Sequence, residues 1–544
     1  MLRRALSGRT GAIATTLVAG TVLWSSTSRQ VHNDAPPLSG KQQKLESPSL
    51  AELVGQRNLS TIVWGSNRSG VLTPGSDTCV PTTVKWLDNV ALRDLALHKK
   101  YAACVDARGD VYLWGSGTSL TQDQMPKLIL KGKDIRVIQL THSKLYALSA
   151  SGKVYALSST PSEEKLNNWS GWVGSKSGFV DFLEVLPKED LGWGERITSI
   201  VAGDNHLLAV TSKGRTFAHP VNMHANNYSQ LGMRKVEVQN DPKVGIRESF
   251  AVDLVPRSVV DPFIRASNVN HQAGSSSESD KVSRVDDKSI HFCHYFFEIP
   301  VLRGVVIEQV AAGSRSSFGR TSTGRVLAWG ANEYGQLGLG SDTTLETVMI
   351  PTEVNLWRFT SSATKTRCLD VSAGGDLTSF TVERLDESKP TLIDLLMCGN
   401  GRWGGLGNNA YSTAQGTPVK VKSISGLLEY NEATRCLEPI QPQSVVISPS
   451  GHIMVTLNTS RAAKGAGRDL VVWGRNADGE LGNGKRASVA GARAVEGAGG
   501  RVLLGMRVGE LRDARGRVSG QGQVEQRAAA GDGNSAIYWR VVGH

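Results

Sequence analysis

The sequence contains none of the short motifs that identify common classes of enzyme. There is no G-x-S-x-G nucleophile turn, no H-E-x-x-H zinc motif and no phosphate-binding G-x-x-x-x-G-K-[ST] loop. Each motif places a nucleophile, metal ligands or a cradle of backbone amides at a fixed spacing. We therefore predict a protein that is not an enzyme, with no catalytic residue, cofactor-binding residue or metal ligand.

Cysteine is scarce as well. The six cysteines are irregularly spaced and none belongs to a C-x-x-C pair, which argues against a disulfide framework and a zinc ribbon. His291, Cys293 and His294 form a tight H-x-C-H cluster. Their spacing does not suit one tetrahedral ion, and aromatic residues surround them. We interpret this cluster as structural.

Acidic residues are absent from the N-terminus until Asp34, whereas Arg3, Arg4 and Arg9 lie among Ser, Thr, Ala and Leu. This composition is typical of a mitochondrial presequence, predicted for residues 1–10. Residues 11–28 carry no charge and are just long enough for one transmembrane helix. Residues 29–57 are predicted to form a polar linker.

These features predict a mitochondrial protein. We expect the N-terminal segment to attach it to a membrane, and we favour the inner membrane. A secretory signal peptide is the alternative. Five N-x-S/T triplets, at Asn58, Asn67, Asn168, Asn227 and Asn458, fit secretion but also arise by chance.

Basic residues exceed acidic ones, with a net charge of +11, but no long Lys/Arg block occurs. Residues 485–527 hold nine basic and four acidic residues among many Gly and Ala. This stretch has no interleaved aromatic residues for base stacking. We expect no nucleic-acid partner and interpret the stretch as part of an irregular, solvated last blade.

One phrase recurs through the rest of the chain: a turn of small residues, a short strand, a Gly-containing turn, and a strand ending in Trp-Gly. The clearest copy runs from Val310-Ala-Ala-Gly313 through Trp329-Gly330 to Tyr334-Gly-Gln-Leu-Gly338. Seven residues occupy the aromatic position, and with the Gly that follows five of them they are the candidate structural anchors: Trp64, Gly65, Trp114, Gly115, Tyr155, Phe217, Trp329, Gly330, Cys398, Gly399, Trp473 and Gly474.

One copy of the phrase is divided between the two ends of the chain. Thr61–Gly65 has only its second half, and Arg527–Trp539 has only its first half. A small sheet cannot bury both faces alone, but sheets stacked around a ring can. The sequence therefore predicts an all-β, seven-bladed propeller over residues 58–544, closed by hydrogen bonds between its ends.

The gap between Phe217 and Trp329 is the longest between anchors, and its excess falls at residues 233–299. The middle of this segment is rich in Ser and charge, so a mobile surface insertion is expected. A partner-binding arm is the alternative.

The motifs Ala312-Gly313, Trp329-Gly330 and Tyr334-Gly-Gln-Leu-Gly338 resemble the repeat of the regulator of chromosome condensation family. That resemblance implies a seven-bladed propeller. A WD-type propeller is disfavoured because no Trp-Asp blade endings recur. Together with the N-terminus, the chain resembles a fungal mitochondrial inner-membrane family implicated in assembly of respiratory complex III.

The resemblance implies a non-enzymatic scaffold or assembly factor whose partners are mitochondrial proteins, such as complex III subunits or intermediates. One alternative is a guanine-nucleotide exchange factor for a small GTPase, although the side chains needed for exchange cannot be mapped here. Another is an assembly protein of the mitochondrial ribosome or its RNA.

Overall fold

The computed structural model divides the chain into two units, Met1–Ser47 and Pro48–His544. The structure describes residues 50–55, 58–72, 78–115, 126–159, 182–239, 249–260 and 290–543, apart from 359, 362, 388, 432–433, 460–466 and 498–499. The described residues all belong to the second unit.

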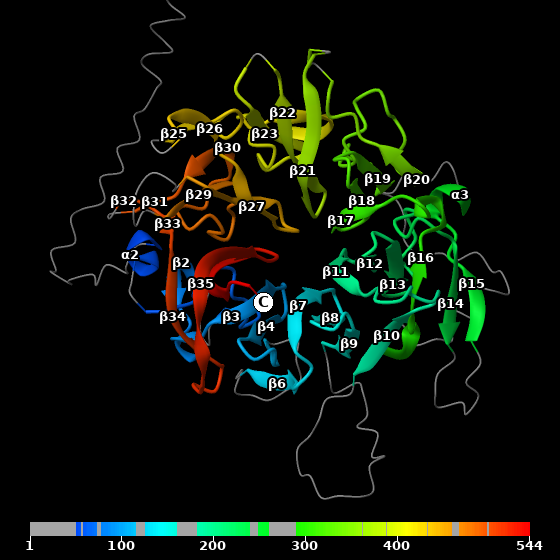
Figure 1. Cartoon of the computed structure of the whole chain (residues 1–544), viewed down its shortest axis with the longest axis horizontal. Coiled ribbons are helices and arrows are strands. Elements are labelled where there is room, and N and C mark those ends of the chain that lie inside the picture. The colour runs from blue at the N-terminus through cyan, green and yellow to red at the C-terminus, as the bar shows by residue number, and fades with distance from the viewer. Residues whose placement is uncertain are drawn as a thin grey trace, which may run out of the picture. The chain divides into compact units, whose positions relative to one another are not determined.

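The second unit is a ring of seven antiparallel blades, as predicted (Figure 1). Each blade has four main strands, written here from the ring axis outward. Blade 1 contains β35 (Val518–Ala530), β36 (Asn534–Val541), β1 (Ile62–Gly65) and β2 (Thr78–Thr83). Blade 2 contains β3 (Leu92–Leu97), β4 (Ala102–Asp106), β5 (Val111–Trp114) and β6 (Lys127–Leu130). Blade 3 contains β7 (Ile135–Leu140), β8 (Lys144–Ser149), β9 (Val154–Ser158) and β10 (Leu183–Pro187).

The remaining blades follow the same order. Blade 4 contains β11 (Ile197–Ala202), β12 (His206–Thr211), β13 (Thr216–Pro220) and β16 (Tyr295–Glu298). Blade 5 contains β17 (Ile307–Ala312), β18 (Ser316–Thr321), β19 (Val326–Ala331) and β20 (Thr347–Glu353). Blade 6 contains β21 (Lys365–Gly374), β22 (Leu377–Leu385), β23 (Leu392–Gly401) and β24 (Ser412–Lys420). Blade 7 contains β27 (Pro442–Ile447), β28 (His452–Leu457), β29 (Arg468–Gly474) and β30 (Val489–Ala494).

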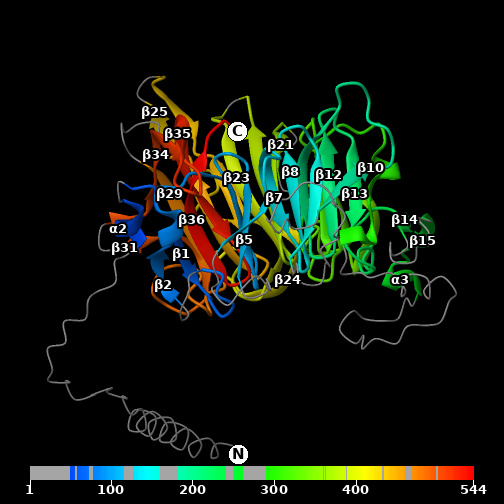
Figure 2. The same cartoon turned by 90° about the horizontal axis from the view of Figure 1, so that it is seen from below.

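The ring has two faces that differ in their connections. On the turn face, the innermost strand of each blade turns into the second strand. On the linker face, the outermost strand of one blade connects to the innermost strand of the next. Figure 2, a side view, shows β25 (Leu428–Asn431) and β34 (Met506–Arg512) at the same edge of the ring as the C-terminus, which is the linker face.

The two ends of the chain close the ring in blade 1, which confirms the expected closure. β1 pairs with β36 along its whole length, from Ile62 opposite Ile537 to Gly65 opposite Asn534. β36 pairs in turn with β35. The first and last strands of the propeller are thus neighbours in one sheet, and backbone hydrogen bonds hold them together.

The hydrophobic core is divided among the spaces between neighbouring blades. In one such cluster, Phe318 and Val326 of blade 5 pack with Phe380 and Val382 of blade 6. Each second strand is covered on both sides, and β22, for example, is buried over most of its length. Because both faces of these strands are buried, the strands lack a clear alternation of apolar and polar residues.

Glycine after the Trp329 anchor is required by close packing. Gly330 has φ +106°, and a Cβ atom built there would lie 2.7 Å from the Arg315 carbonyl oxygen in the neighbouring turn. A side chain at this position would therefore collide with the backbone of the same blade.

The presequence (1–10), the candidate transmembrane segment (11–28) and most of the predicted linker lie outside the described residues. Among the residues that the structure does describe, no helix has the length and apolar character needed to span a membrane. The end of the linker departs from the expected polar segment. Leu50–Val54 forms α2, and Leu50, Leu53 and Val54 pack beside Trp64. Spacings of three and four residues place these apolar side chains on one face of a helical turn.

The 233–299 segment is not wholly an insertion. Its last part supplies β16, which pairs with β13 as the outermost strand of blade 4 and joins β10 of blade 3 in parallel. Before β16, the described part of the segment forms a hairpin of β14 (Lys235–Gln239) and β15 (Ser249–Asp253), followed by α3 (Arg257–Val260) and the 3-10 turn Ile290–Phe292. The predicted mobile middle, Gly274–Lys288, lies outside the description.

The basic 485–527 stretch is more regular than expected, and the prediction of an irregular blade was wrong. It contains β30, β34 and most of β35, and β34 and β35 form a hairpin in which Gly509 lies opposite Gly522. Small residues hide the alternation of a strand at the sequence level, because they add little apolar signal on either face. The remaining short elements are β26 (Cys436–Pro439), β31 (Glu496–Gly497), β32 (Gly500–Arg501), β33 (Leu503–Leu504) and the 3-10 turns Lys85–Leu87 and Pro300–Leu302.

Candidate functional site

The four tryptophan anchors all lie between blades, and each hydrogen-bonds to the blade before its own. The loop between the third and fourth strands of one blade presents a backbone carbonyl to the indole N–H of the next blade. Four such bonds are present, from Trp64 to Glu480 at 2.7 Å, Trp114 to Val71 at 2.7 Å, Trp329 to Gln230 at 3.0 Å and Trp473 to Gly405 at 2.9 Å. The anchors therefore fasten neighbouring blades to one another, in addition to filling the space between them.

Two of these carbonyls accept a second hydrogen bond. Ser317 Oγ donates to the Gln230 carbonyl at 2.7 Å and lies 2.9 Å from His206 Nε2. A hydroxyl has one proton, so the imidazole N–H donates to Ser317. Burial lowers the pKa of His206 to about 3, so this histidine is neutral near pH 7.

The same arrangement recurs where the ring closes between blades 7 and 1. Ser535 Oγ donates to the Glu480 carbonyl at 2.8 Å and lies 3.0 Å from His452 Nε2. The Gly405 and Val71 carbonyls have no such serine, because Ile453 and Ala102 stand at the equivalent strand positions.

The anchors of the weaker repeat copies, Tyr155, Phe217 and Cys398, also lie between blades, but they make other contacts than the tryptophans do. The Cys398 thiol donates to the Gln336 carbonyl at 3.3 Å. Phe217 is fully buried, and Tyr155 is almost fully buried against Phe182. The residues after Tyr155 and Phe217 are alanines, whereas the glycines after the other anchors all have positive φ: Gly65, Gly115, Gly330, Gly399 and Gly474.

Sequence reasoning missed the acceptor carbonyls and the His206–Ser317 pair. The acceptors are backbone atoms, so the loop sequence does not mark them. A signal for the pair does exist, since His206 and His452 follow the small-residue turn in their repeats.

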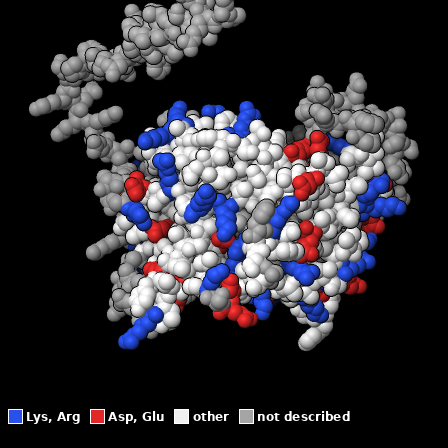
Figure 3. All heavy atoms as spheres, turned by 90° about the horizontal axis from the view of Figure 1, so that it is seen from above, with Lys and Arg blue, Asp and Glu red and all other residues white. Residues whose placement is uncertain are grey.

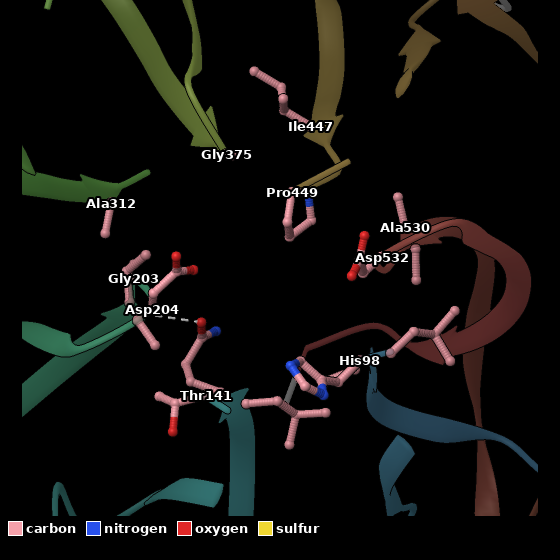
Figure 4. Close-up of a pocket in the computed structure, with 18 of the residues that line it drawn as sticks. His98, Thr141, Gly203, Asp204, Ala312, Gly375, Ile447, Pro449, Ala530 and Asp532 are labelled. Atoms are coloured by element: carbon pink, nitrogen blue, oxygen red, sulfur yellow. Dashed lines mark hydrogen bonds between the residues drawn. The ribbon is translucent and has the colours of Figure 1, made fainter. Parts of the chain in front are cut away.

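A cavity of about 840 Å³ lies on the ring axis, and all seven blades contribute to its lining. Its walls are the innermost strands and their turns, which include Gly203, Ala312 and Gly375 (Figure 4). In Figure 4, the side chains of His98, Asp204 and Asp532 are directed into the cavity from three different blades.

The charged side chains around this cavity are of mixed sign. Burial, followed by neighbouring His142, lowers the pKa of His98 to about 4, so His98 is neutral near pH 7. Burial raises the pKa of Asp204, against the opposing effects of Ser314 and Arg315. The lining also includes apolar side chains such as Leu95, Ile138 and Ile447, so the cavity is of mixed polarity.

The cysteine of the H-x-C-H cluster lies beside β14 and belongs to a hydrophobic core cluster. Cys293 is buried, its thiol donates to the Glu237 carbonyl at 3.3 Å, and burial raises its pKa to about 12. Across the described part of the chain, no group of three or more His, Cys, Asp or Glu side chains is placed to hold a metal ion.

Comparison with known proteins agrees with this geometry. Models of the regulator of chromosome condensation (RCC1) repeat match residues 323–380 and 307–336, which cover the clearest copy of the phrase. The chain is a β-propeller that contains regulator of chromosome condensation repeats.

This RCC1-type chain has relatives named as mitochondrial. It is 24% identical to Protein FMP25, mitochondrial, of Saccharomyces cerevisiae over 444 residues, which are 78% of this chain and 63% of that protein. It is 21% identical to the RCC1 domain-containing protein RUG3, mitochondrial, of Arabidopsis thaliana, over 67% of this chain and 66% of that protein. The chain thus spans just under two thirds of each of these relatives.

Solved structures show the same fold. Human WBSCR16 superposes with a TM-score of 0.53 at 16% identity, over 89% of this chain and 99% of that one. Prp20p of Saccharomyces cerevisiae superposes with a TM-score of 0.52 at 15% identity, over 89% and 92%.

Proposed function

We propose that this protein is a non-enzymatic scaffold of the mitochondrial inner membrane that supports assembly of respiratory complex III. The observation that carries the proposal is the ring itself: seven blades, with buried hydrogen bonds from four tryptophan anchors that join neighbouring blades and with connections of varied length between the strands. A fixed ring with variable connections is suited to holding partners in a defined arrangement.

The location rests on two independent supports. FMP25 and RUG3 are both named as mitochondrial proteins. This chain also begins with an Arg-bearing segment that lacks acidic residues, followed by an uncharged stretch at 11–28. We infer that the N-terminal segment directs the chain to mitochondria and attaches it to the inner membrane.

The non-enzymatic part of the proposal rests on the chemistry of the candidate sites. Burial keeps the Cys293 thiol protonated and His206 neutral. These groups are used in hydrogen bonds within and between blades.

The test is loss of the protein in its own organism. Native gels of solubilised mitochondria should show less assembled complex III, and pulse-labelled mitochondrial translation should be unchanged. Normal complex III with reduced translation would instead favour a role at the mitochondrial ribosome, and normal results in both would leave the proposal without support.

A matched pair of rescue chains tests the membrane segment. The full chain should restore complex III. A chain that starts at Gln30 behind another matrix-targeting sequence should restore less, and alkaline extraction should release it. If both chains resist extraction and rescue equally, the 11–28 segment is not the membrane anchor.

A further inference from the structure

The exposed large apolar side chains gather on the linker face of the ring. On the turn face, the exposed apolar side chains include Trp403 and Tyr411 of blade 6. The linker face carries many more, supplied by the connections after blades 3, 4, 5, 6 and 7 and by strand ends beside them: Trp193, Val301, Val306, Trp357, Leu385, Tyr430, Leu437, Met506, Val508, Val518 and Val542.

Trp193 is the most exposed of these side chains, at 98% of its accessible area. It stands at the tip of a turn that the ring holds firmly. The buried carboxylate of Glu195 accepts hydrogen bonds from the Gly192 amide at 2.9 Å and the Thr211 hydroxyl at 2.5 Å, and it is paired with Arg215. The turn is thus fixed by the blade while its tryptophan projects into solvent.

Two basic residues, Arg196 and Lys213, lie at or beside this turn. Lys131, Arg136, Arg196 and Lys213 are exposed at the linker-face ends of blades 2 to 4, and within the described residues none of them forms an ion pair. The Lys213 ammonium lies beside the turn, 2.7 Å from where a Cβ atom of Gly192 would stand. Among the acidic neighbours, Glu184 is paired with Lys153 and Glu189 with Arg303, whereas Asp190 is exposed and forms no ion pair with the described residues. The unpaired charge around Trp193 is therefore mainly positive.

The apolar side chains of the linker face are separated from one another, and this separation indicates which kind of partner the surface suits. They project singly from separate connections, with polar and charged residues between them. Figure 3 shows the side of the ring, where Lys, Arg, Asp and Glu are mixed among uncharged residues. A protein-binding core is usually a contiguous apolar patch, whereas isolated apolar tips beside basic residues suit the interface of an anionic bilayer.

We propose that the linker face, centred on Trp193, binds the surface of an anionic lipid bilayer. Trp193 inserts at the level of the headgroups, and Arg196 and Lys213 contact lipid phosphates. The inference extends the proposed membrane-associated role, on which it rests for its physiological setting. Its test uses vesicles alone, so it can fail while the complex III experiment succeeds, or succeed while that experiment fails.

The experiment measures amide hydrogen exchange of the full chain with preformed vesicles. Vesicles of phosphatidylcholine mixed with phosphatidylglycerol should protect peptides that cover residues 188–196 and 299–306. Vesicles of phosphatidylcholine alone should protect them much less, and added salt should reduce the protection. Because the readout is local, attachment through the N-terminal segment cannot produce it. A peptide covering residues 400–411, on the turn face, should stay unchanged.

Three variants sharpen the test. Trp193→Ala should abolish protection of residues 188–196, and the doubly substituted Arg196→Gln, Lys213→Gln chain should need about 30-fold more anionic lipid for half-maximal protection. Trp403→Ala, an exposed tryptophan on the other face, should behave as the unmodified chain. All three should keep the unmodified thermal unfolding midpoint, since the substituted side chains are exposed.

Several results would overturn the proposal. Equal protection by neutral and anionic vesicles would remove the role of the basic residues. Protection that survives Trp193→Ala would remove the role of the tryptophan. Protection by single-stranded RNA but not by vesicles would make the linker face a nucleic-acid surface.

Discussion

Removing the indole N–H should destabilise the ring by different amounts at two tryptophans that look alike in the sequence. Trp329 and Trp473 are both fully buried, and both donate to a carbonyl of the preceding blade. After Trp329→Phe, the Gln230 carbonyl still accepts from Ser317. After Trp473→Phe, the buried Gly405 carbonyl loses the donor that it has in the described structure.

The magnitudes follow from this difference. Both substitutions remove similar apolar area, so that contribution largely cancels between them. Loss of one hydrogen bond at Trp329 lowers the free energy of unfolding by about 1 kcal/mol. At Trp473 the carbonyl is also left buried without a partner, which adds about 1–2 kcal/mol. Trp473→Phe should therefore be the more damaging variant by about 1–2 kcal/mol.

The assay is equilibrium unfolding in urea, comparing midpoints at an unchanged slope. The doubly substituted Ser317→Ala, Trp329→Phe chain provides the matched control. It removes both donors from the Gln230 carbonyl. When Trp329→Phe is added to a chain that already carries Ser317→Ala, the further loss of unfolding free energy should therefore equal the loss caused by Trp473→Phe in the unmodified chain. Equal losses for the two single variants would refute the argument, as would a larger loss for Trp329→Phe.

Three further predictions follow from features of the ring. Deletion of Ala528–His544 should lower the thermal midpoint of the whole ring, because β1 loses the strand that joins it to β35; an unchanged, equally cooperative transition would contradict closure through blade 1. Gly330→Ala should lower the free energy of unfolding by about 2–3 kcal/mol, whereas Gly132→Ala, at a positive φ with no neighbour within 4 Å, should lower it by about 1 kcal/mol, and urea titrations of both would test this comparison. Since burial lowers the pKa of His206 from 6.5 to about 3, protonation of this histidine should lower the free energy of unfolding by about 5 kcal/mol as pH falls from 6.5 to 3, and the effect should be absent above pH 6.5; His206→Asn should make the urea midpoint less dependent on pH over that window, and an unchanged dependence would count against it.

The blade count and the closure of the ring were readable from the sequence because the repeat is marked by side chains. A tryptophan and glycine at the end of an apolar strand mark the repeat at Trp64, Trp114, Trp329 and Trp473, and the first half of one phrase is missing at one end of the chain and present at the other. Tyr155, Phe217 and Cys398 became interpretable only after the phrase was known, since an aromatic or cysteine alone marks no particular structure.

Other features left no such mark. The strand Tyr295–Glu298 belongs to blade 4, but a long insertion separates it from its partner β13, so its position along the chain suggested a loop. The hairpin of β34 and β35 is hidden by its many Gly and Arg residues. Trp193 was not singled out, because a tryptophan in the sequence carries no sign of whether it is buried or exposed.

The sharing of blade 1 between the two ends also determines the order in which the protein can be completed. β1 is among the first strands to be synthesised, yet its neighbour β36 is the last. Blades 2 to 7 are contiguous in the chain and can each form their own hairpins as they emerge. Throughout that time β1 has one edge open, and an open strand edge readily pairs with other chains. The ring is therefore most vulnerable to aggregation just before its final residues appear, and a chaperone that shields the N-terminal strand would act over that interval.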